Sequence, residues 1–226
     1  MPPAAREEAR EKTMGQASGR TRVKICGITR SEDGAYAARC GADAIGLVFY
    51  PASPRAVDGG RATAIVRALP PFVTVVGLFV DPEPAWVRRV LADVPLDLLQ
   101  FHGDEPPELC GAFGRPYLKA MAVREGVDLR AWARRHGDAC GLLLDSYHPA
   151  LRGGTGTTFD WSQVPPDLGK PVVLAGGLTP ENVAEAVRKV RPYGVDVSGG
   201  VESEKGIKDP DRVAAFMRGV NSAGTS

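Results

Sequence analysis

Residues 22–49 have the sequence RVKICGITRSEDGAYAARCGADAIGLVF and contain the unit from which the fold is built. Short apolar runs at 22–26 and 44–49 enclose a longer stretch, 31–40, with the mixed composition of a surface helix. Nearly continuous apolar runs are typical of strands covered on both faces, which are usually parallel. The stretch therefore predicts a strand, a helix and a second, parallel strand.

The same alternation continues along the chain. The predicted strands are 22–26, 44–49, 73–80, 96–101, 117–122, 141–144, 171–175 and 194–197. The predicted helices are 31–40, 60–69, 84–94, 106–113, 129–136, 180–190 and 210–220, and the Gly-, Pro- and Thr-rich segment 146–170 predicts little helix. An open doubly wound sheet has about six strands, so eight units favour an α/β fold with a single (β/α)8 TIM barrel.

Composition limits the classes of partner. The chain has 226 residues, of which 43% are hydrophobic, and a net charge of +1. This near-neutral balance predicts no nucleic-acid partner, and the lack of a run of about 18 apolar residues predicts no membrane span. The four cysteines form no CxxC pair and the three histidines no HxxxH spacing, so we expect a reduced cytoplasmic protein without a metal site.

The domain organisation follows from the same pattern. Residues 1–20 are charged and lack both a signal-peptide core and helical periodicity, which predicts a flexible N-terminal tail. The barrel is expected over 21–220 and a frayed C-terminus over 221–226.

Chemistry in such a barrel lies at the carboxyl ends of the strands. Cys26 ends the first predicted strand, and Lys24 points to the same face, where a cation would favour the thiolate. Asp145 follows three leucines at the end of the sixth strand. A buried structural thiol and a turn-capping carboxylate are the simpler interpretations, but together the two groups could move protons in opposite directions.

Glycines end the last two strands. Gly176 and Gly177 follow the seventh, and Gly199 and Gly200 follow the eighth. They are either simple turns or a phosphate cradle, since the loops after strands 7 and 8 often bind phosphate. The segment 153–161, with Gly154 and Gly156, is interpreted as a flap over that phosphate or as a linker.

Two further strand ends carry polar side chains. Arg55 lies on a proline-stiffened loop after the second strand, where it would suit capture of a substrate carboxylate unless it is only solvated. Gln100 and His102 end the fourth strand, and His102 either orients substrate or bonds to backbone.

These segments resemble the phosphoribosylanthranilate isomerases of tryptophan biosynthesis over about residues 22–220. The resemblance is carried by KICGIT at Lys24, 41–55, LQFHGDE at Leu99, LLLDS at Leu142, GGTGTTFDW at Gly153, AGGLTPENV at Ala175 and VDVSGGVE at Val195. The sequence departs from the family pattern at three positions. Ala175 and Gly199 stand where the family often has serine, and Thr157 stands where it often has lysine.

The resemblance implies an Amadori rearrangement of N-(5′-phosphoribosyl)anthranilate to 1-(2-carboxyphenylamino)-1-deoxyribulose 5-phosphate. It assigns Cys26 as general base, Asp145 as general acid, Arg55 to the anthranilate carboxylate and the glycine loops to the phosphate. Lys24, Gln100, His102 and Asp196 complete the expected substrate-binding set. The implied reaction needs no cofactor, and Cys26 favours a tryptophan-only enzyme, because relatives that also serve histidine synthesis tend to use an aspartate base.

Other functions remain open at this level. A related barrel could be an indole-glycerol-phosphate or thiamine-phosphate synthase, and a non-catalytic phosphate-binding barrel would leave Cys26 and Asp145 structural. Assembly as a monomer or a homodimer is expected, and acceptance of a second substrate is undecided.

Overall fold

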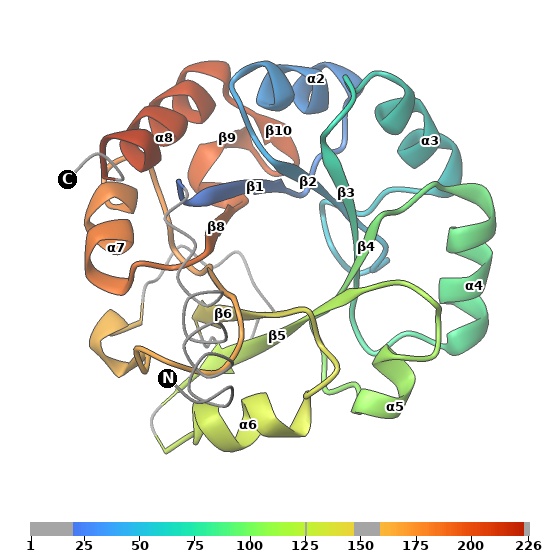
Figure 1. Cartoon of the computed structure of the whole chain (residues 1–226). Coiled ribbons are helices and arrows are strands. Elements are labelled where there is room, and N and C mark those ends of the chain that lie inside the picture. The colour runs from blue at the N-terminus through green and yellow to red at the C-terminus, as the bar shows by residue number, and fades with distance from the viewer. Residues whose placement is uncertain (1–19, 125, 147–158, 224–226) are drawn as a thin grey trace, which may run out of the picture.

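Eight parallel strands close into a barrel in chain order, with β8 pairing back to β1 (Figure 1). The computed structural model describes residues 20–124, 126–146 and 159–223. The strands are β1 Arg22–Cys26, β2 Ala44–Val48, β3 Thr74–Phe79, β4 Leu98–Phe101, β5 Tyr117–Val123, β6 Gly141–Ser146, β7 Val172–Leu174 and β8 Gly194–Val197. The predicted (β/α)8 barrel is confirmed.

Helices surround the barrel in Figure 1. They are α2 Ser31–Arg39, α3 Gly59–Arg67, α4 Pro84–Asp93, α5 Pro107–Cys110, α6 Leu129–Arg135, α7 Val183–Val190 and α8 Pro210–Ala223, with 3-10 turns η1 Trp161–Gln163 and η2 Gly199–Val201. None of the helices in the described part of the chain is long and apolar enough to cross a membrane.

Three helix ends lie three residues from the prediction, and one of them is the end of α5, at Cys110 instead of residue 113. The helix expected from residue 180 begins at Val183, because the Asn182 side chain bonds back to the Thr179 N–H and the Gly177 carbonyl and holds a turn there. The last helix does not fray at residue 221. It continues to Ala223, whose side chain is buried together with Val220.

The core lies between the strands and the helices. Phe79 stacks between Phe49 and Phe101, with ring centroids 5.4 and 6.1 Å away, and all three side chains are buried. Apolar rings of this size each contribute about 1.5–3 kcal/mol when removed from water. This burial stabilises the part of the barrel wall that carries the strand ends described below.

A hairpin that the sequence pattern did not predict follows β8. Strand β9 (Glu202–Glu204) pairs antiparallel with β10 (Ile207–Lys208), and Figure 1 places the hairpin beside β1. The Thr29 hydroxyl, just after β1, donates to the Gly206 carbonyl at the hairpin turn. The hairpin therefore lies at the end of the barrel where the strands terminate.

Candidate active site

A thiol, an ammonium and a carboxylate lie together on β1 and β8. Lys24 and Cys26 are two residues apart and share a face, and Lys24 pairs in register with Asp196. The Lys24 Nζ donates to Asp196 Oδ1 at 3.0 Å, and all three side chains are buried. The structure thus brings three of the predicted site residues together.

Gly46 is a site residue that the sequence reasoning missed. It is the register partner of Cys26 on β2. A methyl group in place of its hydrogen would lie 2.7 Å from the Cys26 Sγ and 2.9 Å from the Lys24 Nζ. Only glycine leaves room for both groups, and a glycine inside a strand is the signal that was available.

Burial and neighbouring charges set the pKa values of Cys26 and Lys24. Burial raises the pKa of Cys26, and although Lys24 acts in the opposite direction, the net shift is upward. Burial lowers the pKa of Lys24, but Asp196 and Cys26 outweigh it, so the pKa of Lys24 is raised overall. The sequence-based expectation that Lys24 favours the thiolate is right in sign, yet burial is the stronger effect.

A second chain of contacts runs through Gln100, His102 and Asp145. The Gln100 Nε2 lies 3.1 Å from His102 Nδ1, and His102 Nε2 lies 3.1 Å from Asp145 Oδ2. With the amide nitrogen donating to Nδ1, the proton of a neutral imidazole sits on Nε2 and is donated to Asp145. The Ser146 N–H donates to the other oxygen of Asp145 at 2.8 Å. His102 therefore partners the carboxylate rather than the backbone.

The two glycine loops pack against each other beside Asp145. Gly176 and Gly177 have φ of 82° and 63°, values that residues with a side chain rarely adopt. A methyl group on Gly176 would also lie 2.7 Å from Asp145 Oδ1, and one on Gly200 would collide with the Leu178 carbonyl. The loops after β7 and β8 thus present closely packed backbone without side chains, as a phosphate cradle requires.

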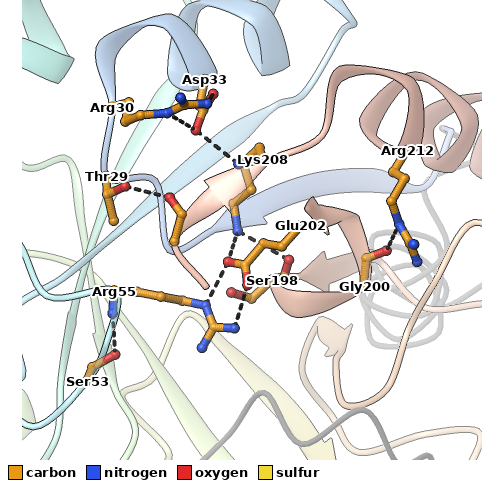
Figure 2. A network of polar contacts seen from close by, with 11 residues as sticks. Thr29, Arg30, Asp33, Ser53, Arg55, Ser198, Gly200, Glu202, Lys208 and Arg212 are labelled. Carbon is orange, nitrogen blue, oxygen red and sulfur yellow. Dashed lines mark hydrogen bonds and ion pairs between the residues drawn. The ribbon is translucent and has the colours of Figure 1, made fainter. Parts of the chain in front are cut away.

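Arg55 has an internal partner that the sequence did not reveal. Its Nε and Nη2 donate to the two carboxylate oxygens of Glu202 at 2.8 and 2.7 Å, and Lys208 Nζ donates to Glu202 Oε1 at 2.8 Å (Figure 2). The fork to Glu202 uses two of the five guanidinium N–H donors. Glu202 and Lys208 are functional candidates that the sequence reasoning missed.

Gly154 and Gly156 lie outside the described residues. Within 20–124, 126–146 and 159–223, no group of three or more His, Cys, Asp or Glu side chains is arranged to hold a metal ion. The described part of the site consists of ionisable side chains and half-buried glycine loops.

The fold and these side chains define a (β/α)8-barrel enzyme with acid–base groups at the carboxyl ends of its strands. Residues 23–219 match the family model of N-(5′-phosphoribosyl)anthranilate (PRA) isomerase. This chain belongs to the N-(5′-phosphoribosyl)anthranilate isomerase family, as its sequence motifs predicted.

Individual relatives agree with that assignment. The chain is 62% identical over 203 residues to the N-(5′-phosphoribosyl)anthranilate isomerase of Nitrosococcus oceani, covering 90% of this chain and 98% of the relative. It is similar to the crystal structure of the phosphoribosyl anthranilate isomerase of Thermotoga maritima, with 42% identity, a TM-score of 0.83 and coverage of 89% and 99%.

A further similar structure contains a ligand. It is a phosphoribosyl anthranilate isomerase in complex with reduced 1-(o-carboxyphenylamino)-1-deoxyribulose 5-phosphate, with 40% identity, a TM-score of 0.80 and coverage of 89% of this chain and 99% of that one. The family assignment decides against the two synthases and the non-catalytic barrel that the sequence left open.

Proposed function

We propose that this chain is the phosphoribosylanthranilate isomerase of tryptophan biosynthesis, with Cys26 as general base and Asp145 as general acid. It converts N-(5′-phosphoribosyl)anthranilate to 1-(2-carboxyphenylamino)-1-deoxyribulose 5-phosphate. The observation that carries the residue roles is the placement of a buried thiol at the end of β1 and a buried carboxyl at the end of β6 of one barrel.

The two groups fit the two proton transfers of the reaction. Asp145 in its protonated form gives its proton to the furanose ring oxygen, the C1′–O bond breaks, and the nitrogen lone pair forms a protonated imine. The Cys26 thiolate then takes the proton from C2′, and the C–H electrons move toward the imine nitrogen to give an enolamine. Tautomerisation of the enolamine yields the ketone. The His102 contact to Asp145 at 3.1 Å holds the acid in one orientation during the first step.

Binding is assigned to the remaining groups. The Arg55 donors that do not face Glu202 receive the anthranilate carboxylate, and the loops at Gly176–Gly177 and Gly199–Gly200 receive the phosphate through backbone N–H groups. Lys24 and Asp196 surround the thiol, and Gln100 acts through His102. The flap containing Gly154 and Gly156 would close over the phosphate.

The proposal is tested with purified protein and freshly generated N-(5′-phosphoribosyl)anthranilate. We expect anthranilate-adduct fluorescence to fall at a rate proportional to enzyme concentration, while a ketone carbon signal of the aminoketose appears in the 13C NMR spectrum of the unreduced mixture. Absence of turnover, with the barrel still folded, would contradict the assigned activity.

Arg55→Ala should mainly raise KM. If Arg55 holds the carboxylate in both the ground state and the transition state, its loss removes uniform binding and leaves kcat almost unchanged. Loss of a charge-assisted bidentate contact corresponds to about 2 kcal/mol or more, which is at least about thirtyfold in KM. An unchanged KM would place carboxylate recognition on another group.

The pH dependence of kcat/KM should reflect the raised pKa of Cys26 as the base. Only the thiolate can accept the C2′ proton, and burial places the pKa of Cys26 above its ordinary value of about 8.5. In Asp145→Asn, where no general acid has to stay protonated, the logarithm of the residual kcat/KM should therefore rise with pH through neutrality by about one per pH unit, since that ratio reports the free enzyme. A plateau already reached at pH 7 would contradict this.

The described surface favours the homodimer over the monomer. Phe72 and Tyr193, with exposed fractions of 101% and 55%, are the exposed large apolar side chains among the described residues. They precede β3 and β8 and therefore lie at the same, N-terminal end of the parallel barrel. We expect a dimer mass in sedimentation equilibrium and a monomer for Phe72→Asp; a monomeric parent chain would contradict the assignment.

A further inference from the structure

We infer that Glu202 is a positioning residue for carboxylate recognition: it fixes the guanidinium of Arg55 in the site, and Lys208 in turn holds Glu202. The inference rests on the proposed function, because it deepens the role given there to Arg55. It adds Glu202 and Lys208 of the β9–β10 hairpin to the residues that determine selectivity for a substrate with an aromatic carboxylate.

The contacts fix the guanidinium in one plane. Glu202 accepts hydrogen bonds from Nε and Nη2 of Arg55, so both donors on the guanidinium edge that faces the hairpin are used. The opposite edge, formed by Nη1 and the second Nη2 hydrogen, is thereby turned away from Glu202 with a defined direction. A second carboxylate can be received there in the same plane, without displacing the first.

The arginine is also placed next to the thiol by packing. A methyl group on Gly27, the residue after Cys26, would collide with the Arg55 Cδ and lie 2.9 Å from the Ser198 Oγ. The stem of Arg55 therefore crosses the barrel wall over Gly27, and Figure 2 shows its guanidinium meeting Glu202 from the facing loop. Without Glu202 the long side chain would regain its rotational freedom at this point.

Charge explains why two hairpin residues are needed. Arg55, Glu202 and Lys208 are two cations and one anion, and the Glu202 and Lys208 side chains are 5% and 2% exposed. A buried cation without enough anionic partners favours the arrival of a further anion. Burial raises the pKa of Glu202, but the hydrogen bonds from Arg55 and the charge of Lys208 together outweigh it and lower the pKa overall, so Glu202 is ionised when substrate arrives.

Hydrogen bonds connect the β9–β10 hairpin to the barrel. The Lys208 N–H donates to Asp33 Oδ2, and Asp33 also receives two hydrogen bonds from Arg30 (Figure 2). The Lys208 Nζ donates to the Ser198 carbonyl at 3.2 Å, at the end of β8. The support for Arg55 is therefore part of a fixed framework.

The test compares two ligands that differ only in the carboxylate. The first is reduced 1-(o-carboxyphenylamino)-1-deoxyribulose 5-phosphate, and the second is its counterpart with an unsubstituted phenyl ring. Calorimetric Kd values are measured for the parent chain, Glu202→Gln, Arg55→Ala and the double variant. Glu204→Gln is the matched control, because Glu204 is an exposed glutamate of the same strand.

We expect the parent chain to prefer the carboxylated ligand by at least about thirtyfold, and Glu202→Gln to lose at least tenfold of that preference while binding the phenyl ligand as before. In the Arg55→Ala background Glu202→Gln should have no further effect, since the two act as one unit. The control should match the parent chain.

Other outcomes overturn the inference. Equal weakening of both ligands makes Glu202 merely structural, and an unchanged or higher preference makes it a competitor for Arg55. If Arg55→Ala keeps the preference, the carboxylate role in the proposed function fails instead, whatever Glu202 does. Should Glu202→Gln not fold, Glu202→Asp, which keeps the charge but shortens the reach, is measured in the same way.

Discussion

Cys26→Ser should fold like the parent chain and lose turnover by about 10³-fold or more. The substitution removes little volume, and the Cys26 thiol packs in a small cluster with Val48 and Leu78, apart from the main core. A serine hydroxyl, however, is far too weak a base to remove the C2′ proton, and general-base catalysis contributes about 10²–10⁴-fold. The measurement is kcat from the decrease of substrate fluorescence, with circular dichroism of both proteins.

The matched control for this variant is Cys140→Ser. Cys140 is an exposed cysteine that precedes β6, away from the carboxyl ends of the strands. It should keep the parent activity. Turnover in Cys26→Ser within a factor of ten of the parent chain would remove Cys26 from the proton transfer.

Asp145→Asn should reduce kcat by about 10²–10⁴-fold with little change in KM. The amide keeps the shape of the side chain and can still accept from the Ser146 N–H through its oxygen, but it cannot deliver a proton to the ring oxygen. Since ring opening is the first step, the loss should appear in single-turnover rates as well.

Asp211→Asn, a change at an exposed aspartate in the first turn of α8, serves as the control and should leave kcat unchanged. An Asp145→Asn enzyme with nearly full kcat would move the acid role to another group, and His102 would be the first alternative because it lies 3.1 Å from the same carboxylate.

The barrel was predictable because its pattern is local. Strands 22–26 and 194–197 were predicted with the bounds that the structure gives to β1 and β8, since each is an apolar run ended by glycine or serine. The β9–β10 hairpin was missed because its strands are two or three residues long and its inward and outward positions are mostly charged. Nothing in such a short segment distinguishes a strand from a loop.

The site was predictable only where the architecture dictates it. Chemistry at strand ends is expected from the barrel itself, so the sequence could place Cys26, Asp145 and the glycine loops at those ends as candidates. The pairing of Arg55 with Glu202 could not, because the two residues are 147 positions apart and meet only through closure of the barrel. The same holds for the balance that sets the pKa of Cys26, in which burial outweighs a cation two residues away.

The most direct test of the central claim is the pH profile of kcat/KM for Cys26→Asp beside the parent chain. The ordinary pKa of a carboxyl is about 3.9 and that of a thiol about 8.5. Both proteins need the same protonated acid, so its titration cancels in the ratio of their kcat/KM values. If residue 26 is the base, the ratio of kcat/KM in Cys26→Asp to that in the parent chain should fall by about tenfold per pH unit through neutrality. A ratio that does not change with pH would show that another group removes the proton.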